Sequence, residues 1–200
     1  MKKKIVCIIS VFMLMMCLTA CGGPTPTETV DSFLTAVKAQ DSESIKTIYA
    51  EEDFEAFDMG EDSEDNLYGD LEETLMTKLL DFEYTLSNEQ INEDKATVDV
   101  TFKTYELGKA MSSWITEYIS QAFALAFGGA SDEQLEKLAE TILTDKIDDA
   151  EEKTFEKTVT VSLTDKDGAW VIDEFEEEGE FYNALTGGMI EAMNEIDEMW

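Results

Sequence analysis

Two stretches that alternate between apolar and polar residues constrain the fold of this chain more than any other feature. In residues 82–105 the alternation runs along both sides of a polar turn at 92–95, and residues 154–172 repeat the arrangement around a turn at 165–168. Alternation with a period of two is typical of antiparallel strands that bury one face. The sequence therefore predicts two antiparallel hairpins.

Helical periodicity surrounds and separates these hairpins. Thr25 can cap the first helix, with Pro26 at its first position and Glu28 completing a capping box, and Ser131 with Gln134 can cap a later one. The expected helices cover residues 27–40, 41–49, 67–80, 107–127, 131–150 and 181–199. The predicted fold class is α+β, with an antiparallel sheet packed on N-terminal helices, a helical pair inserted between the two hairpins and a C-terminal helix.

The first 21 residues have the organisation of an export signal. Lys2 to Lys4 precede an apolar run, Ile5 to Met16, which is shorter than the roughly 20 residues that a membrane span needs. The run leads into Leu18 to Cys21, where small residues precede a cysteine. The segment resembles a bacterial lipoprotein signal, and the resemblance implies diacylglycerol on the Cys21 sulfur and cleavage just before it. A plain signal peptide and a single membrane span are the alternatives.

This interpretation divides the chain into a lipoprotein signal peptide at residues 1–20, a lipidated tether at 21–26 and a single α+β domain at 27–200. All three Cys residues lie at or before position 21, so no disulfide is expected within the domain. The mature chain is long enough to bury a substantial core. We expect Cys21, carrying fatty acyl chains such as palmitate, to hold the domain at the extracytoplasmic face of the cell membrane.

Composition excludes several classes of chemistry. The chain has no His and no Arg, which removes His-dependent nucleophiles, imidazole-bound metals and bidentate guanidinium contacts. Three of the 14 Lys belong to the expected signal, so 11 Lys remain against 46 acidic residues, a formal net charge of −35. Such a surface repels nucleic acid and anionic lipid headgroups. No nucleic-acid partner is expected.

Two acidic segments are candidate cation sites. An EF-hand loop would use Asp165, Asp167, Gly168 and Glu174. Its first position would then be Leu163, which has no side-chain ligand, so a hairpin turn is the preferred interpretation. The dense acidic block at 51–65 lacks glycine-spaced ligands and is interpreted as a solvated loop. No metal site, cofactor site or catalytic residue is assigned.

The helix expected at 107–127 is apolar on much more than one face. The simplest interpretation places it between the sheet and the helix at 131–150. Alternatively, it could line a cavity for a small apolar ligand or form a docking face for a protein partner. Contact with lipid is disfavoured, because interfacial helices carry basic residues on their polar face and this one offers only Lys109.

Three segments carry a further resemblance: Thr27 to Gln40, Asp41 to Tyr49, and Leu163 to Ile172 with its Gly-x-Trp-x-Ile pattern. Together they are similar to secreted lipoproteins with the nuclear-transport-factor-two-like fold. That resemblance implies a cone in which a curved antiparallel sheet wraps around a long helix. The helical pair at 107–150 and the C-terminal helix depart from the pattern, and either could plug the cone. No catalytic residue of that family can be carried over.

These observations favour a lipid-anchored extracytoplasmic binding or accessory protein that is not an enzyme. Its expected contacts are the membrane, through the lipid on Cys21, and a protein partner or small apolar ligand at 107–127. One alternative is a carboxylate-based lyase or isomerase with a cone-shaped pocket, since the family resembled includes such enzymes. The other is an acidic surface protein that holds cations.

Overall fold

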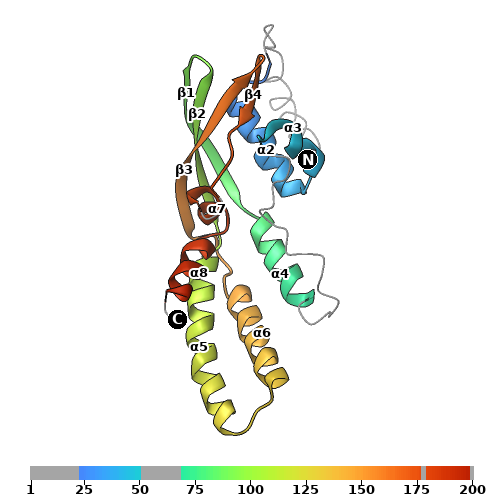
Figure 1. Cartoon of the computed structure of the whole chain (residues 1–200), viewed down its shortest axis with the longest axis vertical. Helices are drawn as coiled ribbons and strands as arrows, with labels where there is room; N and C mark the ends of the chain where they lie inside the picture. Colours follow the sequence, from blue (N-terminus) through green and yellow to red (C-terminus); the bar gives the residue numbers. More distant parts are fainter. Residues whose placement is uncertain (1–22, 51–68, 177–178, 199–200) are drawn as a thin grey trace, which may run out of the picture.

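One antiparallel sheet organises the molecule. The computed structural model describes residues 23–50, 69–176 and 179–198. The strands follow one another in the order β1 (Glu83–Asn92), β2 (Lys95–Thr104), β3 (Phe155–Lys166) and β4 (Ala169–Ile172) (Figure 1). The two predicted hairpins are confirmed as β1–β2 and β3–β4, and continuous pairing of β2 with β3 joins them.

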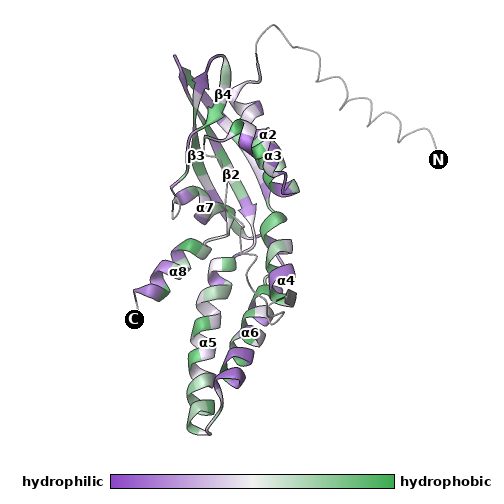
Figure 2. Ribbon diagram, turned by 45° about the vertical axis from the view of Figure 1, so that its right-hand side comes forward, coloured by the Kyte–Doolittle hydropathy of each residue, from purple (hydrophilic) through white to green (hydrophobic). Residues whose placement is uncertain are grey.

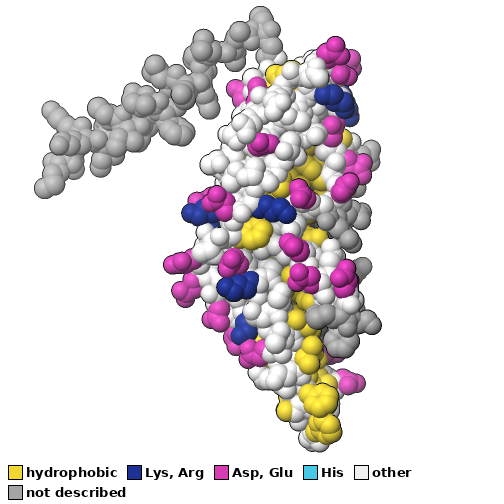
Figure 3. All heavy atoms as spheres, turned by 90° about the vertical axis from the view of Figure 1, so that its left-hand side faces the viewer, with side chains coloured by type: hydrophobic (Ala, Val, Ile, Leu, Met, Phe, Trp, Pro, Cys, Tyr) yellow, Lys and Arg dark blue, Asp and Glu magenta, His cyan; other side chains and the backbone are white. Residues whose placement is uncertain are grey.

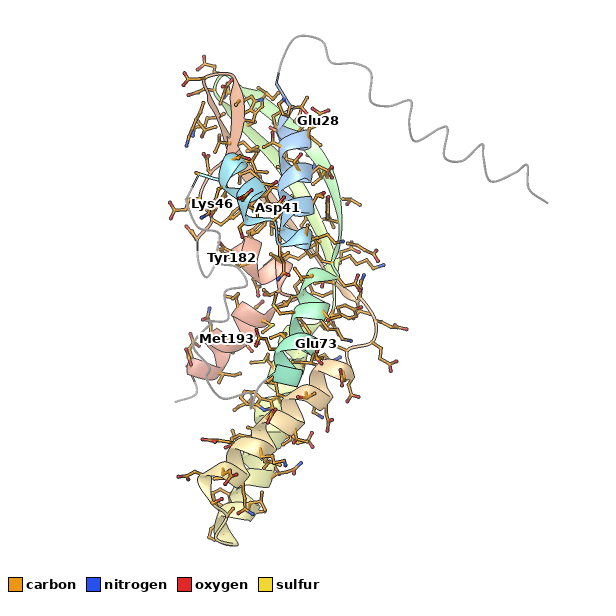
Figure 4. The ribbon with its side chains drawn as sticks, turned by 90° about the vertical axis from the view of Figure 1, so that its right-hand side faces the viewer. Glu28, Asp41, Lys46, Glu73, Tyr182 and Met193 are labelled. Carbon is orange, nitrogen blue, oxygen red and sulfur yellow. The ribbon has the colours of Figure 1, made fainter. Side chains whose placement is uncertain are left out.

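Two N-terminal helices cover one face of this sheet. Helix α2 (Pro26–Ala39) begins with the predicted capping box of Thr25 and Glu28, and α3 (Ser42–Ile48) is capped by the Asp41 carboxylate. Both helix starts are labelled in Figure 4, where Glu28 lies toward the end of the molecule farther from the helices α5 (Leu107–Phe127) and α6 (Asp132–Asp148). A bridge between Tyr49 and Ile172 then ties the end of α3 to the edge strand β4.

The main core lies between the sheet and these helices. Alternate residues of β2 and β3 point into it, as the period of two predicts. Its largest fully buried side chains include Phe33, Leu34, Phe82, Phe102, Leu163, Ile172 and Leu185. The core therefore draws on both ends of the chain, from α2 to the short helix α7 (Glu180–Leu185).

Helices α5 (Leu107–Phe127) and α6 (Asp132–Asp148) form an antiparallel pair, which we call the arm. Figures 1 and 2 show the arm projecting beyond the end of the sheet. The expectation that 107–127 lies between the sheet and the next helix is wrong, since α5 packs against α6 and the C-terminal helix α8 (Met189–Asp197) instead. Helix α4 (Gly69–Leu80) lies against α6, and a second core forms there from Leu71, Leu75, Leu79, Leu107 and Ile147.

The C-terminal segment forms two short helices rather than the single helix expected at 181–199. Helix α7 (Glu180–Leu185) packs on β2 and β3, and α8 (Met189–Asp197) packs on α5. Between them Gly187 and Gly188 have φ values of 64° and 86°, in the left-handed region that ends a helix. These glycines break the helix that periodicity alone predicts.

The predicted α+β class is confirmed, with the helical pair between the hairpins. Within the described ranges, no helix has the length and apolar character that crossing a bilayer requires.

Candidate functional site

The predicted lipid-attachment residue, Cys21, lies outside the described residues, as does the acidic block 51–65. The structure therefore leaves the lipid anchor a prediction. The segment 107–127, for which a ligand cavity or a docking face is the alternative interpretation, is described in full. It provides the candidate site of this chain.

The two helices of the arm are joined by polar contacts as well as apolar ones. Indole Nε1 of Trp114 on α5 donates to the carbonyl of Ala139 on α6 at 2.9 Å. Lys146 Nζ lies 2.6 Å from the Glu117 carboxylate, and this contact lowers the pKa of Glu117 and raises that of Lys146. The predicted capping box of Ser131 then begins α6. These contacts hold one face of α5 against α6.

The outer part of α5 leaves apolar side chains exposed at the tip of the arm. Exposure is 41% for Ile119, 67% for Phe123, 41% for Leu125 and 82% for Phe127, and we call these four residues the distal apolar surface. The Phe123 and Phe127 rings lie edge to face with centroids 5.0 Å apart. Figure 3 shows hydrophobic side chains continuing down the arm to its tip. This surface is unusual, because water-exposed aromatic groups seldom cluster unless something covers them.

The distal apolar surface carries no charge of its own. No acidic or basic residue occurs between Glu117 and Asp132, in a chain where 30% of residues are charged. Figure 2 shows the contrast between the hydrophobic end of α5 and the hydrophilic residues of α6. The first turns of α6 supply three exposed acids at its border, Asp132, Glu133 and Glu136. The tip is thus apolar on α5 and acidic on α6.

A hollow along α5 is polar. It has a volume of about 690 Å³, and its lining includes Lys109, Ser112, Thr116, Glu117 and Gln121. This lining does not suit a small apolar ligand, because apolar pockets are lined mainly by apolar and aromatic groups. The exposed aromatic residues lie on a projecting helix end. The geometry therefore fits a docking surface better than a ligand cavity.

A polar cluster fixes the root of the arm where it leaves the sheet. The Tyr105 hydroxyl, between β2 and α5, donates to Asp81 Oδ2 at 2.8 Å. Lys153 Nζ, between α6 and β3, donates to Asp81 Oδ1 at 2.7 Å. Lys78 on α4 donates to the Ala150 carbonyl at 2.6 Å and lies 4.4 Å from the centre of the Tyr105 ring. Three separate chain connections are thereby joined at one point.

Backbone contact closes the other side of the root. The Gly108 amide donates to the Gly187 carbonyl at 2.9 Å. A Cβ on Gly187 would overlap the Tyr105 carbonyl, and a Cβ on Gly108 would overlap the Gly188 carbonyl. Only glycine allows the α7–α8 turn to approach the start of α5 this closely. The root of the arm therefore has a defined geometry.

Sequence reasoning did not identify this cluster. Asp81, Tyr105 and Lys153 lie in three connections far apart in the sequence, and no motif links them. The signal that could have pointed to them is their position, since Asp81 and Lys153 immediately precede predicted strands and Tyr105 ends one. Periodicity finds elements, but it does not tell which of their ends meet.

The segment weighed as a calcium loop is a hairpin turn, as predicted. Asp165 Oδ1 accepts from the Gly168 amide at 2.6 Å, while Asp167 and Gly168 have φ values of 59° and 90°. Two successive positive φ values are typical of a tight hairpin turn between antiparallel strands. Across the described parts of the chain, no three acidic, His or Cys side chains are grouped as metal ligands.

The contact between Asp81 and Lys153 should make stability depend on pH. The hydrogen bond from Lys153 lowers the pKa of Asp81 below its ordinary 3.8, so this stabilisation is present above pH 3.8 and is lost as the pH falls through the lowered pKa. Because Asp81 is half exposed, solvent screens the pair, and D81N is expected to reduce the free energy of unfolding by about 1 kcal/mol at pH 7. Denaturant unfolding at pH 7 and pH 3 measures the difference, which should shrink at the lower pH.

A double-mutant cycle with K153M checks the origin of that effect. If Asp81 acts through Lys153, the two substitutions together should destabilise the protein by less than the sum of their separate effects. Strict additivity would show that the Asp81 contribution comes from elsewhere.

Fold and site together define a class of architecture: an α+β domain with a projecting helical hairpin whose tip is apolar. No family model matches the sequence, and no curated protein matches it. The chain is similar to a crystal structure from Bacillus subtilis subsp. subtilis strain 168, described as that of a "putative lipoprotein (ycdA)", with 19% identity and a TM-score of 0.38. The match covers 86% of this chain and 48% of that one, so this chain spans about half the length of its neighbour.

Proposed function

We propose that this protein is a lipid-anchored accessory protein of the cell envelope, held at the extracytoplasmic face of the membrane through Cys21. Its arm docks onto another protein in the same compartment. The distal apolar surface is the observation that carries the proposal, because its aromatic side chains are exposed in the isolated chain. Such surfaces mark sites that a partner covers.

The position of the arm supports a role away from the lipid. From Cys21 to Pro26 the tether spans at most about 18 Å, and α2 begins toward the end of the molecule farther from the arm. Helix α5 alone has 21 residues, which corresponds to a length of about 31 Å. A lipid on Cys21 would therefore hold the sheet end near the bilayer and leave the arm free to reach a partner.

The sheet supports a binding role more than a catalytic one. The proposal retains the likeness to the nuclear-transport-factor-two-like fold, with α2 and α3 covering one face of the antiparallel sheet. In that space the Phe181 ring lies 5.5 Å from Phe102 and 6.1 Å from Phe33, measured between centroids. Among the described residues the buried polar side chains are Thr29, Thr104, Asn183 and Thr186, and every described carboxylate is at least partly exposed. No specific observation favours the carboxylate enzyme or the cation-holding protein.

Fractionation of the cells that make the protein tests both parts of the proposal. The full-length chain is expected in the membrane fraction, and C21A in the soluble extracytoplasmic fraction. After solubilisation in dodecyl maltoside, the wild type should migrate on a native gel as a complex larger than the monomer. F123S/F127S should weaken the affinity for the partner by at least about 100-fold, since each buried Phe contributes about 1.5–3 kcal/mol.

The matched control is I91S, because Ile91 is another exposed apolar residue, at 56%, and lies on β1 away from the arm. This variant should keep the complex. Retention of C21A in the membrane would contradict the lipid anchor. Monomeric migration of the solubilised wild type would contradict the docking role.

A further inference from the structure

From the tip of the arm we infer the chemistry of its partner: a protein groove with an apolar floor and a rim of Lys or Arg. This inference rests on the proposed function and adds the kind of site that receives the arm. It is carried by two independent features, the spacing of the exposed apolar residues and the charges beside them.

The spacing is that of a helix read from one side. Ile119, Phe123 and Phe127 recur every four residues, so they form one stripe along α5, and their exposure rises from 41% to 82% toward the tip. Ala122 and Ala126 lie between them and leave the helix narrow on that side. Anchors at this spacing fit an apolar groove that accepts the face of a helix.

The charges that follow the stripe in the chain are mainly negative. Asp132, Glu133 and Glu136 are exposed in the first turns of α6, and Lys137 is the first basic residue after them. Glu117 is already paired with Lys146 at 2.6 Å and adds little. Within a few residues of the end of the stripe, the tip of the arm therefore carries three exposed acids and one exposed Lys, a net negative charge. Electrostatic complementarity calls for a basic rim on whatever covers it.

The same charges disfavour the two other occupants. A second copy of this chain would bring an identical acidic border against the first, and like charges at a contact are repulsive. An anionic bilayer would be repelled in the same way. The tip could reach the anchoring bilayer only if the molecule lay along it, which would press the acidic sides of the domain against the headgroups. A basic-rimmed protein groove fits both features.

Site-specific photocrosslinking in the intact cell tests the inference. A benzoylphenylalanine replaces Phe123 in the full-length chain and, as the matched control, Ile91. We expect a protein adduct from position 123 that is absent from position 91, and mass spectrometry should place the crosslink in an apolar segment flanked by Lys or Arg. An adduct with lipid, an adduct with a second copy or no adduct at all would overturn the inference.

The predicted basic rim of the partner is tested separately, by removing the acidic charges of this chain that it would face. D132N/E133Q/E136Q should lower the yield of the adduct from position 123 about tenfold, whereas E43Q/D94N/E174Q, which removes the same charge outside the arm, should leave it unchanged. Asp132 and Glu133 also lie in the first turn of α6, so their substitution can affect the helix itself. A second measurement therefore uses the wild-type acids. Raising the salt concentration should weaken the wild-type adduct and have much less effect on the neutralised variant.

These outcomes separate the inference from the proposed function. Suppose that the wild type forms the solubilised complex but D132N/E133Q/E136Q leaves the crosslink unchanged. This result would overturn the basic groove and leave the docking role standing. If the wild-type protein gave neither the complex nor the adduct, both the docking role and the inference would be overturned.

Discussion

Replacing Phe181 by alanine is expected to lower the free energy of unfolding by about 4 kcal/mol, which corresponds to a fall in melting temperature of about 12 °C. The Phe181 ring stacks on Phe175 with centroids 3.7 Å apart and meets Phe102 edge to face at 5.5 Å. Truncation removes these contacts and leaves a cavity between α7 and the sheet. Urea unfolding followed by circular dichroism gives the value.

The matched control is F127A, which removes the same group from the arm. Phe127 is 82% exposed, so its truncation should change stability by less than about 0.5 kcal/mol. Equal effects of the two substitutions would show that α7 does not pack into the sheet core.

The second large effect is expected at Gly187, where alanine should lower the free energy of unfolding by about 3 kcal/mol, or about 9 °C in melting temperature. The φ of 64° is unfavourable for any residue with a Cβ, and that Cβ would overlap the Tyr105 carbonyl. The Tyr105 carbonyl and the Cα of residue 187 both belong to the backbone, so neither can move without shifting the root of the arm. Calorimetric melting measures the change.

G129A separates the two causes. Gly129 also has a positive φ, 80°, but a Cβ there would meet nothing within 4 Å. This variant should lose only the roughly 1 kcal/mol that a left-handed conformation costs a non-glycine residue. A loss as large as that of G187A would mean that the close approach to Tyr105 is not the cause.

Local signals in the sequence predicted most of the secondary structure correctly. Capping boxes at Thr25 and Ser131 marked two helix starts, and the period of two marked both hairpins. These signals act within a few residues, so they survive whatever the rest of the chain does. That is why the element order and the α+β class could be predicted.

The placement of α5 could not be predicted in the same way. A helix that is apolar on several faces is usually buried, which is why it was expected between the sheet and α6. Which faces of α5 are covered depends on where the arm leaves the sheet. That position is fixed by contacts such as the one between Asp81 and Lys153, which are 72 residues apart in the sequence. The segment 107–127 was identified as a candidate contact surface, but its exposed part, from Ile119 to Phe127, required the structure.

The C-terminal helix was mispredicted for a related reason. Gly187 and Gly188 are adjacent, and helix propensity treats them as a weakness within one helix. The backbone approach of Tyr105 and Gly108 turns that weakness into a break. Local helix propensity and long-range backbone contact both act on Gly187 and Gly188. Only the helix propensity can be inferred from the sequence.

Strands β2 and β3 stay paired up to Thr104 and Phe155, the residues on either side of the segment that contains the arm. No residue of the arm belongs to a strand, so the sheet does not depend on the arm for its pairing. Insertion of two helical turns into α5 and a matching insertion into α6 would displace the tip by about 10 Å, with every strand still in register. The length of the arm can therefore change without altering the core of the sheet. In one scaffold, the length of the helical hairpin would then set how far the apolar tip lies from the sheet.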